Sequence, residues 1–235
     1  MRAESLAEMA ARYIEELIVT GTLKPGSQIK EDDIAGNLNI SRPPVREALN
    51  SLEGEGLVVR KPRRGAFVIE MSEKDIWEVY TLKAELYAMA LGDAMDKITA
   101  DEIEELRFLV AQMKANSETE DEKILEFQRY HREFHIRIMT IAGNQRLLKF
   151  AANLHKQIQR YSFQTLGYET HLKTSNRFHH MIVDLVDAED KENACKMMKT
   201  HVIKAMEFLL SNPDIYKEPD QAAGRQEAAR SGPAE

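Results

Sequence analysis

A helical repeat of apolar residues is the feature that most constrains how the later part of this chain can fold. Beyond Ser72, apolar residues recur at steps of three, four and seven, which places them along one face of a helix. One such stripe contains Ile76, Val79, Leu82, Leu86 and Met89, and a later one contains Ile124, Phe127, Phe134 and Ile138. Six stripes follow one another without a convincing strand between them, which predicts an all-helical bundle of about six helices.

The residues before this bundle show a different order of elements. Apolar spacing predicts a helix over residues 5–20 and a short second helix over residues 34–39. Ser41 is expected to cap a third helix, whose first turn contains Pro43-Pro44, because prolines are tolerated where amides have no intrahelical partner. Two β-prone runs within residues 57–69 flank a basic turn and predict a hairpin. These are the elements of a winged helix-turn-helix, so the fold class is expected to be mainly α.

The expected third helix has two distinct faces. Its apolar face consists of Val45, Ala48, Leu49 and Leu52. Arg42, Arg46 and Asn50 follow one another at four-residue steps on another face, which is free to contact a ligand. Between Arg42 and Arg64 there are six cations and three anions, so this segment has a net charge of +3. Because the whole chain has a net charge of −7, the remaining residues together carry −10. A local basic patch on an acidic protein predicts binding to DNA.

Four motifs in this region occur in a fixed order. They are GTLKPG at 21–26, ISRPPVREAL at 40–49, EGLV at 55–58 and RRGAFV at 63–68. With these motifs the chain closely resembles the winged-helix domain of GntR-type regulators. The resemblance implies that Arg42 and Arg46 contact DNA and that Gly65 lets the wing tip approach the minor groove. The expected DNA-binding set also includes Ser41, Pro43, Asn50, Arg63 and Arg64.

Four of the seven histidines occupy positions that suggest a metal site. His131 and His135 are four residues apart, so their imidazoles lie one turn apart on one helical face and can chelate one ion. His179 and His201 lie on two later helices beside apolar stripes that should face the core. His180 is a weaker candidate, since it lies about 100° around the helix from His179. Spacing alone also allows four core histidines that are hydrogen-bonded rather than metal-bound, which is the commoner role of a lone core histidine.

The bundle resembles the FCD ligand-binding domain of the FadR-like branch of GntR regulators. The likeness rests on His131-Arg132-Glu133-Phe134-His135, with Ala142-Gly143-Asn144 behind it, and on the later His179 and His201. The resemblance implies a metal held by these four histidines, although the family has a carboxylate or amide ligand where this chain has His131. An all-imidazole set favours zinc or nickel over magnesium or calcium.

The same resemblance points to a small-molecule effector, expected to be an organic acid. Family members commonly have an arginine and a glutamate on the first bundle helix, where this chain has Lys83 and Tyr87. Lysine can pair with a carboxylate but lacks the planar fork of arginine, which favours a different or unusually shaped ligand. Lys83, Tyr87 and Arg160 are the effector candidates. The alternative interpretation is that they are ordinary residues of an amphipathic surface.

Two other functions compete with this one. A zinc hydrolase built on the histidines would need a glutamate directly after His131, but Arg132 is there and Glu133 points roughly 200° away. The protein is therefore not expected to be an enzyme. The second alternative keeps the DNA-binding domain but makes the bundle a dimerisation module without metal or ligand.

The expected domains are a winged helix-turn-helix at 1–71, a helical effector-binding and dimerisation domain at 72–211 and a flexible tail at 212–235. With no apolar run long enough to span a membrane and no secretion leader, the protein is expected in the cytoplasm. Cys195 is expected to be a small buried apolar residue. The sequence thus predicts a transcriptional regulator that binds a roughly palindromic double-stranded operator as a homodimer.

Overall fold

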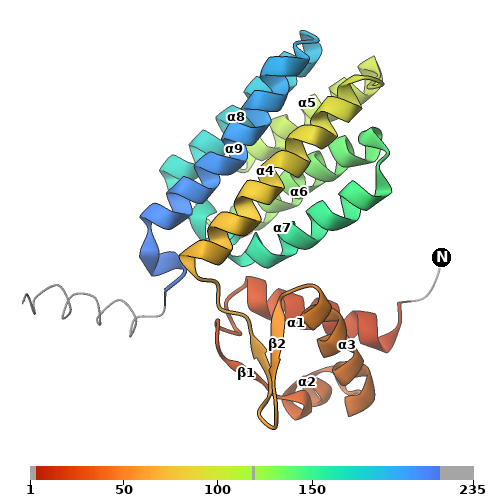
Figure 1. The fold of residues 1–235 in the computed structure, drawn as a ribbon, viewed down its shortest axis with the longest axis vertical. Coiled ribbons are helices and arrows are strands. Elements are labelled where there is room, and N and C mark those ends of the chain that lie inside the picture. Colours follow the sequence, from red (N-terminus) through yellow and green to blue (C-terminus); the bar gives the residue numbers. More distant parts are fainter. Residues whose placement is uncertain (1–3, 118–119, 218–235) are drawn as a thin grey trace, which may run out of the picture. The chain divides into compact units, whose positions relative to one another are not determined.

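The computed structural model describes residues 4–117 and 120–217 of the chain (Figure 1). These residues form two compact units, one within Met1–Ser72 and His155–Arg160, the other within Glu73–Leu154 and Tyr161–Glu235. The helices of the described part include none that is both long and apolar enough to cross a membrane.

The first unit combines three helices with a small antiparallel sheet (Figure 1). The helices are α1 (Leu6–Val19), α2 (Glu31–Leu38) and α3 (Arg42–Gly54), and the strands are β1 (Gln28–Ile29), β2 (Val58–Lys61) and β3 (Gly65–Val68). The strand order is β1-β3-β2, so the hairpin β2–β3 is extended at one edge by β1. This confirms the predicted winged helix-turn-helix. The strand β1 was not predicted, because two residues are too few to show an alternating pattern.

The predicted two faces of α3 are present in the structure. Val45, Ala48, Leu49 and Leu52 are at most 1% exposed and pack with residues of α1 such as Ala10 and Ile14 and with Leu57 and Val58 at the start of the hairpin. Arg42, Arg46 and Asn50 are exposed on the other face. The core of this unit therefore fixes α3 by one face and leaves the charged face open.

Ser41 is the N-cap residue of α3, but its side chain makes no capping hydrogen bond. A capping hydroxyl accepts from the amide of the second or third helical residue, and here those residues are Pro43 and Pro44, which have no N–H. The prolines thus remove the donors that a cap would satisfy. By contrast, Ser5 forms a complete capping box with Glu8 at the start of α1.

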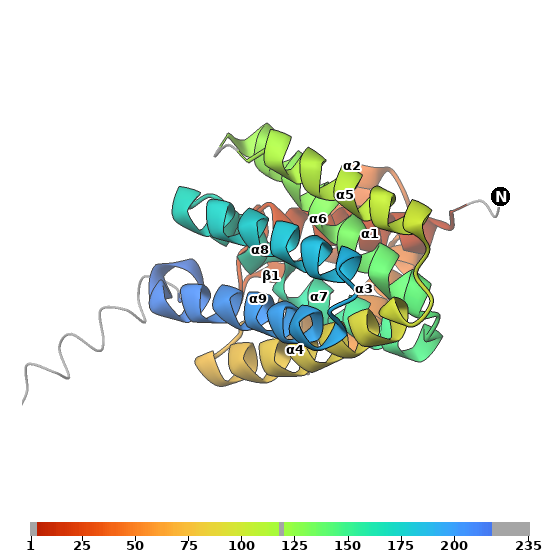
Figure 2. The same ribbon diagram turned by 90° about the horizontal axis from the view of Figure 1, so that it is seen from above.

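The second unit is a bundle of six described helices, as predicted (Figure 2). They are α4 (Glu73–Met95), α5 (Ala100–Ala115), α6 (Asp121–Ala142), α7 (Gln145–Leu166), α8 (Glu169–Asp187) and α9 (Lys191–Ser211). α4 packs against α9 and α6, α5 packs against α6 and α8, and α8 packs against α9, so these five helices form a closed ring.

The chain continues beyond Ser211 as an ordered segment. Pro213–Ile215 forms a 3-10 turn, and Ile215 and Tyr216 are buried. The predicted flexible tail began at residue 212, so its first residues instead pack on the bundle. Its remainder, residues 218–235, lies outside the described residues.

The prediction of which residues of α4 are buried is wrong in part. Leu82 and Met89 are 52% and 54% exposed, whereas Tyr80, Lys83 and Tyr87 are 2%, 5% and 3% exposed. On α7 the large aromatic side chain of Phe150 is likewise 64% exposed. Because α4 has apolar residues on two faces, periodicity alone cannot decide which face points inward.

The contrast between the two N-caps of the first unit predicts their contributions to stability. Ser5→Ala removes a hydroxyl that accepts a backbone hydrogen bond and is expected to lower the free energy of unfolding by about 1 kcal/mol. Ser41→Ala removes a hydroxyl without that role and is expected to change it by less than about 0.5 kcal/mol. Denaturant unfolding of both variants measures the difference, and an equal loss would contradict the role assigned to the prolines.

Candidate functional site

The exposed face of α3 carries the arginines predicted to contact DNA, and both are paired with acidic residues of α2. Arg46 donates from Nε and Nη2 to the two carboxylate oxygens of Glu31, at 3.3 and 3.0 Å. Arg42 Nε lies 3.2 Å from Asp32 Oδ1 and 3.7 Å from Glu31 Oε2. The hydrogen bond from Arg46 lowers the pKa of the Glu31 carboxyl. Both arginine side chains remain more than half exposed, and Ser41, Pro43 and Asn50 are also exposed on this helix.

The tip of the β2–β3 hairpin holds the other residues predicted to contact DNA. Arg63 and Gly65 have φ angles of 61° and 93°, and Gly65 tolerates this left-handed region because it has no Cβ. Gln28 of β1 donates from Nε2 to the carbonyl oxygen of Arg64 at 2.7 Å and so restrains the tip. The side chains of Arg63 and Arg64 are exposed. A restrained basic tip of this kind suits contact with phosphates or the minor groove.

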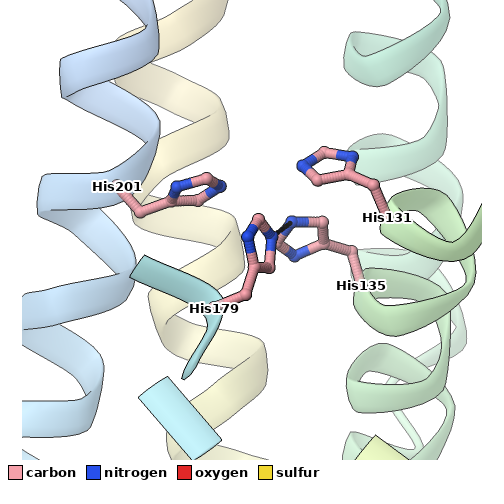
Figure 3. Close-up of side chains that lie close together, drawn as sticks. All are labelled: His131, His135, His179 and His201. Atoms are coloured by element: carbon pink, nitrogen blue, oxygen red, sulfur yellow. Dashed lines mark hydrogen bonds between the residues drawn. The ribbon is translucent and has the colours of Figure 1, made fainter. Parts of the chain in front are cut away.

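The four histidines predicted as metal ligands meet in the core of the helical unit (Figure 3). His131 and His135 lie on α6, His179 lies on α8 and His201 lies on α9. Each offers one ring nitrogen, and these four nitrogens all lie within 4.8 Å of one another. The ring centroids of His179 and His201 are 4.4 Å apart, and those of His131 and His135 are 4.7 Å apart. The fold therefore brings together side chains that are far apart in the sequence.

A backbone contact fixes the tautomer of His179. Its Nδ1 lies 2.7 Å from the carbonyl oxygen of Ser175, and because that oxygen can only accept, Nδ1 carries the proton. The lone pair of His179 is then on Nε2, which lies 3.2 Å from His135 Nε2. In the metal-free state His135 Nε2 must donate across this distance, since two lone pairs would repel each other. A metal ion placed there would replace this hydrogen bond.

Burial determines the charge of the cluster. His135, His179 and His201 are 3%, 0% and 6% exposed. Desolvation is the main cause that lowers the pKa of His135 and His201 well below 6.5 and that of His179 to about 4. Nearby Lys83 lowers all three further. The three imidazoles are therefore neutral at pH 7, which is the form that ligates a metal.

The donor set fits a borderline transition ion. Two imidazole nitrogens bound to one tetrahedral ion at about 2.05 Å lie about 3.3 Å apart, close to the 3.2 Å between the Nε2 atoms of His135 and His179. Imidazole nitrogens suit zinc, nickel or copper, whereas magnesium and calcium need oxygen ligands. The buried polar side chains of the described residues include no carboxylate. The cluster could thus hold a metal ion, and one of the zinc or nickel type.

The glutamate of the zinc-hydrolase motif considered above does not lie at this cluster. Arg132 directly follows His131, and both Arg132 and Glu133 are exposed on α6. Glu133 therefore does not face the buried histidines, where it would have to act on a metal-bound water.

Two of the three effector candidates lie beside the cluster. The ring centroid of Tyr87 is 4.8 Å from that of His135, and Lys83 Nζ is 4.7 Å from the Tyr87 ring centroid. Burial lowers the pKa of Lys83 to about 7. Arg160 belongs to the segment of α7 that groups with the other unit, so the structure does not bring it together with them. His180 is outside the four-histidine cluster.

Sequence reasoning missed two residues that organise these sites. Glu31 pairs with both Arg42 and Arg46, and Ser175 supplies the carbonyl that orients His179. Ser175 lies four residues before His179, a spacing that could have suggested the contact. Glu31 begins α2 and Arg46 lies on α3, so the rest of α2 and a turn separate the two residues. No local spacing in the sequence indicates that they form a pair.

Comparisons with known proteins agree with these features. Residues 6–68 match the family model described as "Bacterial regulatory proteins, gntR family", and residues 78–204 match the "FCD domain". The chain is 29% identical over 195 residues to the "Uncharacterized HTH-type transcriptional regulator YdhC" of Bacillus subtilis, covering 81% of this chain and 83% of the relative. It is 27% identical over 199 residues to the "Nta operon transcriptional regulator" of Aminobacter aminovorans, covering 83% and 90%.

A solved structure shows the same fold over nearly the whole chain. "E. coli McbR/YncC" matches with a TM-score of 0.77 at 21% identity and covers 89% of this chain and 99% of that chain. The FCD match alone spans more than half of the chain. The chain therefore belongs to the GntR family of DNA-binding transcriptional regulators, in the FadR-like branch whose second domain is an effector-binding FCD domain.

Proposed function

We propose that this protein is a cytoplasmic, metal-dependent transcriptional regulator that responds to a small organic acid. As a homodimer it binds a roughly palindromic operator through two winged helices, and each helical domain holds one zinc or nickel ion beside the acid. Binding of the acid changes the affinity for the operator by favouring one arrangement of the two DNA-binding domains. The four-histidine cluster is the observation that carries this proposal.

The DNA-binding part of the proposal is supported by the charges of the first unit. Arg42 and Arg46 lie on the exposed face of α3, which suits entry into the major groove. Arg46 can contact base edges, whereas Arg63 and Arg64 at the hairpin tip suit phosphate or minor-groove contact. Ser41 supports the same role, because its exposed hydroxyl is not used in capping the helix.

The metal part is supported by the neutral, preassembled donors. A bound ion would supply positive charge, and an ion that expands beyond four ligands would accept an anionic ligand beside the imidazoles. His131, His135, His179 and His201 would hold the ion, and the Ser175 carbonyl would keep His179 Nε2 directed at it. The second alternative function, a bundle that only dimerises, gives these four converging nitrogens no role.

The effector class follows from charge balance. A divalent ion with four neutral imidazoles is positively charged, and Lys83 lies nearby in the core. The described residues supply no buried carboxylate to balance that charge. Buried charge is costly unless it is paired, so an acid ligand would provide the missing negative charge. Lys83 can pair with its carboxylate, and Tyr87 lies where it can contact the same ligand.

The homodimer is supported by apolar side chains that the helical unit leaves exposed. Leu82 and Met89 lie seven residues apart on α4 and are 52% and 54% exposed. Their separation of about two helical turns places them on one face, about 130° around the helix from the face that carries Lys83 and Tyr87. An apolar face on a regulator of a palindromic site suits contact with a second copy.

Removal of Arg46 tests the assignment of the recognition helix. Because the operator is unidentified, wild-type protein first selects duplexes from a random-sequence library, and the selected duplex and a scrambled duplex are then the probes. Arg46→Ala is expected to lower the preference for the selected duplex by about tenfold or more, since a bidentate arginine distinguishes one base pair from another. Arg12→Ala on α1 removes the same charge and is expected to keep the preference. Unchanged preference in Arg46→Ala would show that α3 does not read the sequence.

Elemental analysis of the purified protein tests the metal centre. Wild type is expected to contain about one equivalent of transition metal per chain, and His135→Ala and His179→Ala are expected to lose most of it, because each removes a ligand. His180→Ala is the matched control, since it removes an adjacent imidazole outside the cluster and should retain the metal. Absence of metal in wild type after incubation with zinc or nickel would favour the bundle that only dimerises.

Acid is expected to release the metal only at unusually low pH. Protons compete with the ion for the same nitrogens, and a pKa of about 4 keeps His179 unprotonated in the metal-free fold at about pH 5. Metal content after dialysis is therefore expected to stay constant from about pH 7.5 to about pH 5.5 and to fall below that range. Loss centred near pH 6.5, where exposed histidines titrate, would contradict the burial of these ligands.

A further inference from the structure

Glu31 lies at the first position of α2 and reaches both arginines of α3. Its two oxygens accept separate hydrogen bonds from Nε and Nη2 of Arg46, at 3.3 and 3.0 Å, and Oε2 also lies 3.7 Å from Arg42 Nε. The Glu31 side chain is only 23% exposed, so it is partly shielded from the solvent that weakens surface ion pairs. Arg60 also donates from Nη2 to the backbone carbonyl of Arg46 at 3.2 Å. The base of the Arg46 side chain and its guanidinium are thus both restrained.

Two hydrogen bonds to one carboxylate fix the plane of a guanidinium, whereas a single bond allows it to rotate. Glu31 occupies the edge of Arg46 formed by Nε and Nη2, so the remaining donors of the guanidinium point away from α2. Arginine reads a guanine through two parallel hydrogen bonds, which require a defined plane. A guanidinium that is already held loses less conformational freedom when it binds.

The charge of Glu31 acts in a second way. DNA phosphates are the same in every duplex, so a carboxylate beside the contact surface opposes binding to any sequence. This penalty is the same for every duplex, so it lowers affinity in general and cancels in the ratio of two affinities. The effect of Glu31 on specificity therefore comes from the orientation that it imposes on Arg46.

We propose that Glu31 is a specificity-determining positioning residue, which holds Arg46 in the orientation that reads a base and opposes binding to unrelated DNA. This inference rests on the proposed recognition of an operator by α3. It assigns to the first residue of α2 a role in sequence selection although that residue would not itself contact a base.

Binding of the full-length Glu31→Gln variant to the library-selected duplex and to the scrambled duplex tests this role. The ratio of the two affinities is expected to fall by about tenfold, with tighter binding to the scrambled duplex and weaker binding to the selected one. Asp32→Asn is the matched control, since it removes one negative charge from the next residue, whose carboxylate is 72% exposed and pairs with Arg42 rather than Arg46. It is expected to strengthen both complexes alike and to preserve the ratio.

A double-mutant cycle with Arg46→Ala shows whether Glu31 acts through that arginine. In the Arg46→Ala background, Glu31→Gln is expected to change the ratio no further. An unchanged ratio in the single variant, or an equal fall in the Asp32→Asn control, would overturn the inference. If Glu31→Gln does not fold by circular dichroism, the cycle uses Glu31→Asp, which keeps the charge but shortens the reach and should lower the ratio. Failure of wild type to select any sequence would instead overturn the proposed function.

Discussion

Burial of ionisable nitrogens among apolar helices is the constraint on which the helical domain depends. The imidazoles of His135, His179 and His201 and the amine of Lys83 are all at most 6% exposed. Charged forms would be costly in this environment, and the resulting pKa shifts keep the imidazoles neutral at pH 7. The closed ring of α4, α9, α8, α5 and α6 supplies the rigid walls that hold these groups in contact. A domain that needed only a stable core would be served as well by apolar side chains in their place.

The DNA-binding unit depends on a balance of opposite charges rather than on a uniformly basic surface. Arg42 and Arg46 are exposed, yet each lies within 4 Å of a carboxylate of α2. The net charge of −7 likewise limits attraction to DNA in general. Carboxylates beside the arginines oppose the attraction of phosphates to this face, whatever the sequence of the duplex.

The extent to which sequence predicts this structure differs between its elements. The faces of α3 were predicted correctly because Val45, Ala48, Leu49 and Leu52 are apolar and the opposite face is polar. On α4 the same reasoning chose Leu82 and Met89, because large aliphatic residues outweigh alanine, tyrosine and lysine in any apolar pattern. The buried face instead combines small alanines with Ile76, Leu91 and two tyrosines, and leaves Leu82 and Met89 exposed.

The candidate sites show a similar division between local and long-range information. The spacing of His131 and His135 gave one half of the histidine cluster. The apolar stripes beside His179 and His201 indicated that both face the core, but their convergence on the other two was supported by family resemblance and depends on the tertiary fold. The ion pair between Glu31 and Arg46 depends on how α2 crosses α3, which no spacing in the sequence specifies.

The two consecutive prolines of α3 have a consequence for how its first turn meets a ligand. Pro43 and Pro44 fix their backbone φ angles through covalent rings, so the start of the helix needs no hydrogen bond that could exchange. A serine that caps a helix commits one lone pair of its hydroxyl, and with it the rotamer of the side chain, to a backbone amide. The Ser41 hydroxyl makes no such bond, and the two rings restrict the first turn in its place. The start of α3 is therefore a preformed edge beside a hydroxyl that the helix does not use.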